Sequence, residues 1–146
     1  MADTVDQSTR SRIMARIGSK NTKPELTLRK ALHARGLRYR LHSPNVAGRP
    51  DLVFAKYRAA VFVHGCFWHR HPGCPFATTP ATRTDYWLKK FSGNVRRDAE
   101  TRKRLAATGW RVAVIWECSL KKPETVRRTV DTVVEWLKSS ESYLEV

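Results

Sequence analysis

A dense group of metal-binding side chains lies between positions 64 and 74. This segment contains two of the three cysteines and three of the five histidines, together with a Phe-Trp pair. Structural zinc is held by four Cys or His ligands, and Cys66, His71 and Cys74 are close enough in sequence to supply three. Cys118 directly follows an apolar run that predicts a buried strand, so it can supply the fourth. The segment therefore predicts a Cys3His zinc site, with a Cys66–Cys74 disulfide as the alternative.

A second group of residues could hold Mg²⁺ and move a proton. Asp51 follows the turn Gly48-Arg-Pro50 at the start of an apolar run, and Mg²⁺ prefers oxygen ligands such as its carboxylate. The next apolar run delivers His64, the loop beyond it delivers His69, and Glu25 could approach from a helix. A neutral histidine can take a proton from water near pH 7 while Mg²⁺ stabilises the charge that develops on a phosphate. These groups are sufficient for phosphodiester hydrolysis.

Each of these residues also has a structural interpretation. Asp51 could simply end a turn, and Glu25 stands at the third helical position of a capping box. His64 and His69 could be hydrogen-bonded polar groups without a chemical role. His69 also competes with His71 as the zinc ligand, and spacing leaves that choice open.

The charge of the chain predicts a polyanionic partner. The 146 residues carry 28 Lys and Arg against 13 Asp and Glu, a formal net charge of +15. A compact domain with that charge repels itself, so nucleic acid is the expected partner. The length fits one domain over residues 1–146. The sequence lacks an apolar leader and any apolar run of the roughly 20 residues that span a membrane. We therefore expect a soluble, cytoplasmic protein. The odd number of cysteines also disfavours a disulfide.

Capping patterns and apolar periodicity predict a mixed α/β order without internal repeats. Ser8 or Thr9 can cap a basic first helix that Gly18 ends. The capping box Thr22-Lys-Pro-Glu25 opens a second helix, which ends at Gly36. The expected strands are 37–41, 51–54, 59–63 and 110–116, with the second and third joined as a hairpin.

Two further helices complete the predicted order. Thr82 or Thr84 can cap a helix that Ser92-Gly-Asn94 interrupts, and a basic continuation ends at Gly109. A C-terminal helix with valines and a leucine on one side covers positions 126–137.

Six motifs along the chain identify a family. They are Thr9-Arg-Ser-Arg12 with Met14, Gly48-Arg-Pro-Asp51, Phe62-Val-His-Gly-Cys-Phe-Trp-His69, Pro80-Ala-Thr-Arg-Thr-Asp-Tyr-Trp87, Asn94-Val95 with Arg97-Asp98, and Gly109-Trp-Arg-Val112 with Trp116-Glu-Cys118. Together they resemble the very-short-patch (Vsr) mismatch repair endonucleases over nearly the whole chain. The resemblance implies a restriction-endonuclease-like fold of the PD-(D/E)XK type, a mixed central sheet flanked by helices, with catalytic Mg²⁺ and structural zinc. It also implies nicking of one DNA strand 5′ to the thymine of a T:G mismatch left by deamination of 5-methylcytosine.

The resemblance assigns roles to the first two groups of residues. Asp51 becomes the direct Mg²⁺ ligand, and the backbone carbonyl of Val63 replaces the acid-x-Lys pair of the wider superfamily. His69 becomes the general base, with His64 and Glu25 as supporting groups. The zinc ligands become Cys66, His71, Cys74 and Cys118. The His71-Pro-Gly-Cys74 spacing is one residue longer than the family form, which a Pro-Gly turn can absorb.

The resemblance also assigns DNA contacts. Residues 1–20 become a DNA-contacting arm, and Met14 enters the minor groove. Phe67, Trp68 and Trp87 are expected to insert between bases beside the mismatch, because an unstable mismatched step costs least to unstack. Lys90 and Asn94 are the expected mismatch-reading pair. Structural alternatives are a core position for Trp87 beside Phe91 and a helix cap for Asn94.

Two other function classes fit part of the sequence. One is a restriction-like, Mg²⁺-dependent nuclease with another target. The other is a non-catalytic, zinc-braced DNA-binding module, which explains the charge and the cysteines but not Asp51 with the histidines. The expected partner is mismatched double-stranded DNA, bound by a monomer that could also meet mismatch-repair proteins.

Overall fold

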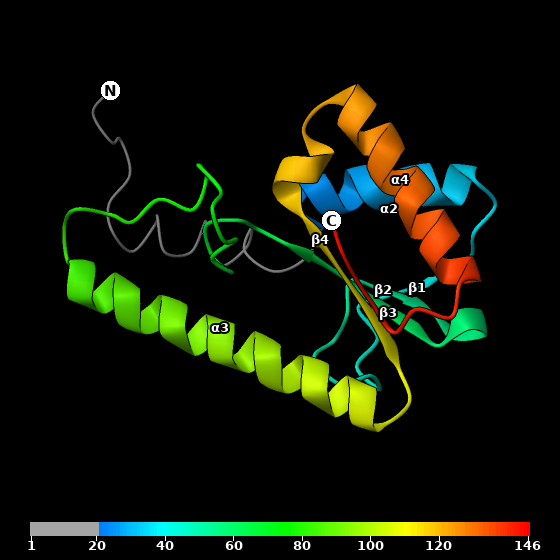
Figure 1. Ribbon diagram of the computed structural model, residues 1–146, viewed down its shortest axis with the longest axis horizontal. Helices are drawn as coiled ribbons and strands as arrows, with labels where there is room; N and C mark the ends of the chain where they lie inside the picture. Colours follow the sequence, from blue (N-terminus) through cyan, green and yellow to red (C-terminus); the bar gives the residue numbers. More distant parts are fainter. Residues whose placement is uncertain (1–20) are drawn as a thin grey trace.

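The computed structural model describes residues 21–146, which form a five-stranded mixed sheet with helices on both faces (Figure 1). The helices are α2 (Lys23–Ala34), α3 (Thr84–Ala107) and α4 (Pro123–Lys138), and short 3₁₀ turns cover Ala55–Tyr57 and Glu117–Leu120. The strands are β1 (Arg40–Leu41), β2 (Leu52–Phe54), β3 (Ala59–His64), β4 (Arg111–Trp116) and β5 (Tyr143–Glu145).

The strands lie in the order β1-β2-β3-β4-β5. The β1–β2 and β2–β3 pairs are antiparallel, as the expected hairpin requires, whereas β3–β4 and β4–β5 are parallel. The connection from β3 to β4 contains α3, and the one from β4 to β5 contains α4. The carboxyl ends of β3 and β4 therefore lie together, which brings His64 opposite Trp116.

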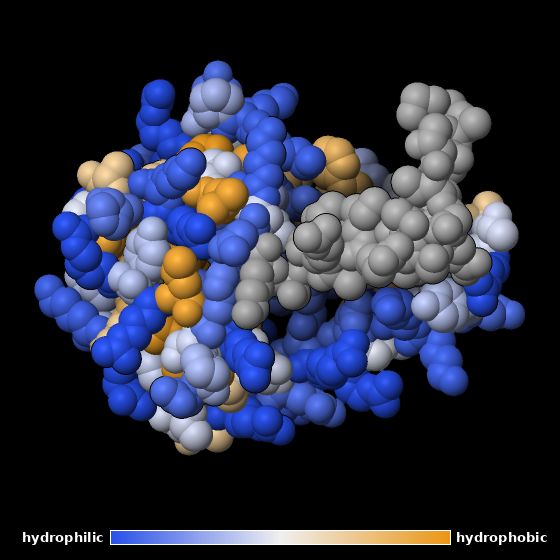
Figure 2. Space-filling view, turned by 180° about the vertical axis from the view of Figure 1, so that it is seen from behind, coloured by the Kyte–Doolittle hydropathy of each residue, from blue (hydrophilic) through white to orange (hydrophobic). Residues whose placement is uncertain are grey.

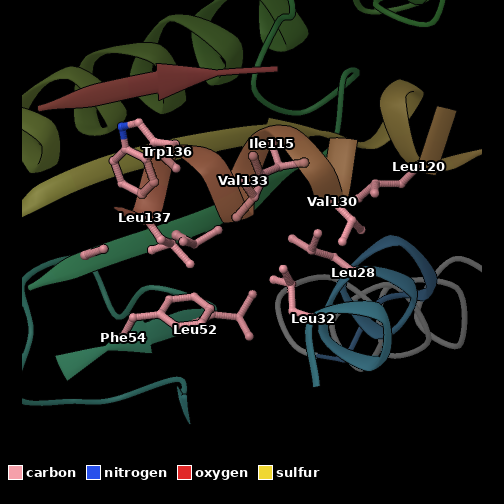
Figure 3. Close-up of a cluster of buried hydrophobic side chains, with 13 residues drawn as sticks. Leu28, Leu32, Leu52, Phe54, Ile115, Leu120, Val130, Val133, Trp136 and Leu137 are labelled. Atoms are coloured by element: carbon pink, nitrogen blue, oxygen red, sulfur yellow. The ribbon is translucent and has the colours of Figure 1, made fainter. Parts of the chain in front are cut away.

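Alternate residues of the central strands enter two separate cores. On one face, Val61 and Ile115 pack with side chains of α2 and α4, including Leu28 and Val133 (Figure 3). On the other face, Ala60 and Val112 contact a second cluster that contains Leu105 of α3. Successive side chains of a strand point to opposite faces, and here both faces are covered by a core. This explains why 59–63 and 112–116 are continuous hydrophobic runs.

Helix α2 begins as the capping box predicts, although its hydrogen bonds differ in one respect. The Glu25 N–H donates to Thr22 Oγ1 at 3.4 Å. The Glu25 carboxylate receives the N–H of Asn21, one residue before the cap, rather than that of Thr22. The prediction that Gly36 ends this helix is confirmed, since Gly36 follows the C-cap with φ of +83°.

Three expectations about elements were wrong. Residues Ser92-Gly-Asn94 do not interrupt α3, which is one continuous 24-residue helix. Its N-cap is Arg83 without a side-chain cap bond, rather than Thr82 or Thr84. The first strand covers two residues instead of five, and β5 was not anticipated.

The helix expected to end at Gly18 lies outside the described residues. Among the helices that the structure describes, none combines the length and the hydropathy needed to cross a membrane.

Candidate active site and zinc-binding loop

A cleft of about 720 Å³ is lined by residues of β3, β4 and β5, of α3 and of the start of α2. The expected catalytic residues Glu25, Asp51, His64 and His69 all line it, so three segments that are separate in the sequence supply one cavity. Within the cleft the side chains form two groups of potential metal ligands, one around Asp51 and one around His69.

The first group joins Glu25 and Asp51 through a residue that the sequence did not single out, His42. Its Nε2 lies 3.0 Å from Glu25 Oε2 and 3.9 Å from Asp51 Oδ1. Glu25 is only 1% exposed, and Arg29 Nη1 donates to its Oε2 at 2.9 Å. Burial, with the neighbouring Glu25 carboxylate, raises the pKa of Asp51 to about 7. A buried carboxylate pair of this kind is stabilised by a bound cation.

The backbone at Val63 fits the expected second ligand of that cation. The Val63 N–H donates to Asp51 Oδ2 at 2.7 Å. The register of Leu52 with Val61 extends to place Val63 opposite Pro50. Proline has no N–H to give to the Val63 carbonyl in the ladder, so this oxygen can serve another partner. Asp51, Glu25 and this carbonyl are the oxygen donors that a site for Mg²⁺ needs.

The second group contains His64, His69 and Asp98 from α3. His69 Nδ1 lies 2.6 Å from Asp98 Oδ2, and because a carboxylate accepts, Nδ1 carries the hydrogen and Nε2 is left as a proton acceptor. The His64 ring is stacked on the His69 ring with 3.9 Å between their centroids. Burial, followed by the charge of His69, lowers the pKa of His64 to about 4, so His64 is neutral at pH 7.

The three cysteines gather around His71 at one side of the cleft. The ligand atoms of Cys66, His71, Cys74 and Cys118 all lie within 4.8 Å of one another. His71 Nδ1 is 3.6 Å from Cys66 Sγ and 3.5 Å from Cys118 Sγ. Tetrahedral zinc with bonds of about 2.3 Å to sulfur and about 2.0 Å to nitrogen separates such ligands by about 3.5 Å. The donor set and its spacing therefore fit zinc, and the geometry groups His71, not His69, with the thiols.

The buried Cys66 thiol is neutral unless a cation lies beside it. Burial and the adjacent Cys118 raise the pKa of the Cys66 thiol to about 12, so thiolates here need a compensating positive charge. All three cysteines lie in the described part of the chain as free thiols, which contradicts the alternative Cys66–Cys74 disulfide. The loop is further fixed by the Cys66 N–H, which donates to Glu117 Oε1 at 2.9 Å.

The residues expected to wedge between DNA bases form an aromatic cluster where the Cys66–Cys74 loop meets α3. The ring of Phe67 lies 5.0 Å from Trp68, 5.8 Å from Trp87 and 5.1 Å from Phe91, measured between centroids. Phe91 is 3% exposed, whereas the two tryptophans are half-buried. Phe91 is thus the buried base of the cluster and the tryptophans are its accessible part.

The expected mismatch-reading pair stands next to this cluster on α3. Lys90 Nζ lies 6.0 Å from the Trp68 ring, and Asn94 Nδ2 donates to the Trp68 carbonyl at 3.1 Å. Arg97 in turn donates to Asn94 Oδ1. Asn94 lies inside a continuous helix, so its interpretation as a helix cap was wrong. Met14 lies outside the described residues.

Sequence reasoning did not assign functions to three residues that the structure places at the site. His42 and Asp98 are the central members of the two cleft groups. Arg70 links the Cys66–Cys74 loop to the next segment, since it donates to the carbonyls of Thr78 and Ala77 at 2.8 and 2.9 Å and stacks on Phe91. Asp98 stands in one of the family motifs, but neither His42 nor Arg70 had a spacing signal.

Comparisons with known proteins give a consistent result. The family described as DNA mismatch endonuclease Vsr matches residues 2–74. The DNA mismatch endonuclease Vsr of Escherichia coli is 42% identical over 139 residues, which cover 94% of this chain and 88% of that protein. The type II nicking enzyme V.XorIIP of Xanthomonas oryzae is 47% identical over 82% of this chain and 88% of that enzyme. The type II nicking enzyme V.NmeAIP of Neisseria meningitidis is 40% identical over 96% and 99%, respectively.

Proposed function

The chain belongs to the Vsr family of DNA mismatch endonucleases, and from this membership we propose that its cleft nicks one strand of DNA, 5′ to the thymine of a T:G mismatch. The observation that carries the proposal is the convergence in one cleft of two carboxylates, the buried Glu25 and the partly buried Asp51, with the His69–Asp98 pair. Metal-assisted hydrolysis of a phosphodiester needs carboxylates that bind a cation and, beside them, a histidine that can accept a proton. A non-catalytic binding module would not need it.

We propose that Asp51 and the Val63 carbonyl hold Mg²⁺, with Glu25 beside them. When bound, Mg²⁺ supplies charge stabilisation for the reacting phosphate and the leaving oxygen. Asp98 accepts from His69 Nδ1 and fixes the ring so that Nε2 takes the proton of the attacking water. The stacked His64, neutral at pH 7, keeps the ring orientation without adding positive charge beside the base.

Recognition of the mismatch is proposed for the aromatic cluster and its neighbours on α3. Trp68 and Trp87 would unstack the base step beside the mismatch, where separation of bases is least costly. Lys90 and Asn94 lie close enough to Trp68 to contact the displaced base edges. The zinc ligands Cys66, His71, Cys74 and Cys118 would hold the loop that carries Phe67 and Trp68 rigid against Trp116, whose ring is stacked on His71 at 4.3 Å.

A panel of duplexes tests this proposal. Duplexes that differ only at one position, as T:G, T:A, C:G or methylated C:G, are incubated with the full chain and Mg²⁺ or with EDTA. We expect a single cut 5′ to thymine in the T:G duplex, dependent on Mg²⁺. Equal cutting of matched duplexes would favour a nuclease with another target, consistent with relatives that are named nicking enzymes. Binding of the T:G duplex without any cut would contradict the enzymatic proposal.

A further inference from the structure

His42 is held in the cleft by an unfavourable backbone. It follows β1, and its N–H donates to the Asp51 carbonyl at 3.3 Å, which continues the β1–β2 ladder by one residue. Its φ is 47°, in the left-handed region that non-glycine residues adopt uncommonly, with Asn, Asp and His the most frequent among them. Five other described non-glycine residues share this conformation, so at His42 it sets the direction of the ring and does not by itself mark a site. The result here is an imidazole directed at two carboxylates.

The distances around His42 Nε2 match those between the ligands of one cation. Six ligands at about 2.1 Å from a central ion place adjacent ligand atoms about 3.0 Å apart and opposite ones about 4.2 Å apart. Nε2 lies 3.0 and 3.1 Å from the two Glu25 oxygens and 3.9 Å from Asp51 Oδ1. Its side chain is 15% exposed, so the ring faces the cleft rather than bulk water.

A simple hydrogen bond from His42 to Glu25 explains less of this arrangement. Glu25 already accepts from Arg29 Nη1 and from the Asn21 N–H, at 2.9 and 3.1 Å. A buried carboxylate with these partners does not require a third donor to be satisfied. The imidazole is instead placed where it meets Asp51 as well, at the point on which the carboxylates converge.

We propose that His42 is a nitrogen ligand of the cation site formed with Asp51 and Glu25, and that it makes this site prefer first-row transition-metal ions to Mg²⁺. Imidazole binds such ions more strongly than it binds Mg²⁺, a hard ion that favours oxygen. On binding, the ring keeps its hydrogen on Nδ1 and Nε2 faces the ion. This inference rests on the proposed function because it concerns the same cleft.

The test measures binding of Co²⁺ and of Mg²⁺ to the full-length, zinc-loaded protein by calorimetry, without DNA. We compare wild type, His42→Gln and the control His33→Gln, which alters an exposed histidine at the end of α2. His42→Gln should weaken Co²⁺ binding by about 10-fold or more and Mg²⁺ binding by less than about threefold, since one nitrogen ligand is lost. His33→Gln should change neither.

Two results would overturn the proposal. Unchanged Co²⁺ affinity in His42→Gln would show that the ring is no ligand, and equal weakening of both ions would show that His42 only orients Glu25. If His42→Gln fails to fold, the wild-type Co²⁺ complex still decides the question by proton NMR. Selective ¹⁵N labelling of the histidine rings should show a paramagnetically shifted ring N–H assigned to His42, and its assignment to His64 or His69 would overturn the proposal. Because no cleavage is measured, this outcome is separate from success or failure on T:G duplexes.

Discussion

At the scale of single residues, the two histidines of the Cys66–Cys74 segment have different surroundings. His69 Nδ1 pairs with Asp98 Oδ2, whereas His71 Nδ1 lies within 3.6 Å of two thiols. Spacing alone could not separate them, because a loop of this length can present either ring to the cysteines. The separation comes from α3, which brings the Asp98 carboxylate to one ring only.

This difference gives a paired prediction. His69→Ala should keep its zinc, but its nicking rate should fall by a factor of about 10² to 10⁴, because the substitution removes the proton acceptor. His71→Ala should lose zinc and stability, because structural zinc contributes directly to folding free energy. Metal analysis, thermal unfolding and single-turnover nicking of the same preparations measure both. Loss of zinc from His69→Ala with zinc retained in His71→Ala would reverse the assignment.

At the scale of elements, the sequence anticipated local patterns better than long-range ones. The capping box at Thr22 and the hairpin of β2 with β3 depend on neighbours in sequence, and both were predicted. Strand β5 is three residues long and forms only through pairing with β4, so its own residues carry little signal. The continuity of α3 was missed because Gly93 suggests a break, although a glycine within a helix costs only about 1 kcal/mol relative to Ala.

The same contrast between local and long-range signals applies to the residues of the cleft. Asp51, His64, His69 and Asp98 lie in motifs that the sequence displays, but the pairing of Asp98 with His69 and of His42 with Glu25 joins residues that are distant in the chain. Their partners are set by tertiary packing of α2 and α3 on the sheet. No spacing rule within one segment could reveal these pairs.

Two glycines offer a matched test of the element-level packing. Gly48 has φ of +78°, and a side chain there would overlap Cγ2 of Thr101 on α3. Gly93 is helical, and a methyl group added to it would meet no described atom within 4 Å beyond its chain neighbours and the backbone of its own helix. Gly48→Ala should therefore lower the free energy of unfolding by about 1–3 kcal/mol, through strain and overpacking. Gly93→Ala should raise it by about 0.5–1 kcal/mol, since helical glycine is costly.

Urea unfolding of the two variants and wild type measures this contrast. The comparison controls for the chemical change, which is the same methyl group in both. Stabilisation by Gly48→Ala would contradict the close approach of the Gly48 turn to α3.

At the scale of the whole molecule, basic side chains are concentrated on α3. The exposed ones are Lys89, Lys90, Arg96, Arg97, Arg102, Lys103 and Arg104. Figure 2 shows one face of the molecule, on which hydrophilic residues predominate around smaller apolar patches. We propose that this helix combines a general electrostatic attraction for DNA with mismatch contacts made by its first half, where Lys90 lies near Trp68.

The two contributions can be separated by substitution. Trp68→Ala should weaken binding to a T:G duplex more than to its matched counterpart, by about 1–3 kcal/mol for the lost stacking. Arg102→Ala should weaken both about equally and reduce the salt dependence of binding. Fluorescence anisotropy at several salt concentrations provides the affinities. If Trp68→Ala lowers the affinity for both duplexes equally, Trp68 only packs within the protein and does not recognise the mismatch.

Metal removal tests the division of labour between the two proposed metals. EDTA at a concentration that sequesters Mg²⁺ should stop nicking and leave one zinc per chain and the unfolding temperature unchanged. Release of that zinc by a thiol-modifying reagent should lower the unfolding temperature, because the Cys66 loop loses its cross-link to Cys118. Protein purified without chelator that contains no zinc would contradict the predicted zinc site.

The most direct test of T:G nicking at the Asp51 cleft is a single-turnover assay on one T:G duplex with both strands labelled. Wild type, Asp51→Asn and the control Asp131→Asn, an exposed residue of α4, are compared at equal DNA occupancy. We predict that wild type and the control cut only the thymine strand, 5′ to the mismatched thymine. Asp51→Asn should bind the duplex but leave it intact, because the amide keeps the contact to Val63 and loses the charge that holds Mg²⁺. Cutting by Asp51→Asn at the wild-type rate, or cutting of both strands by wild type, would contradict this account.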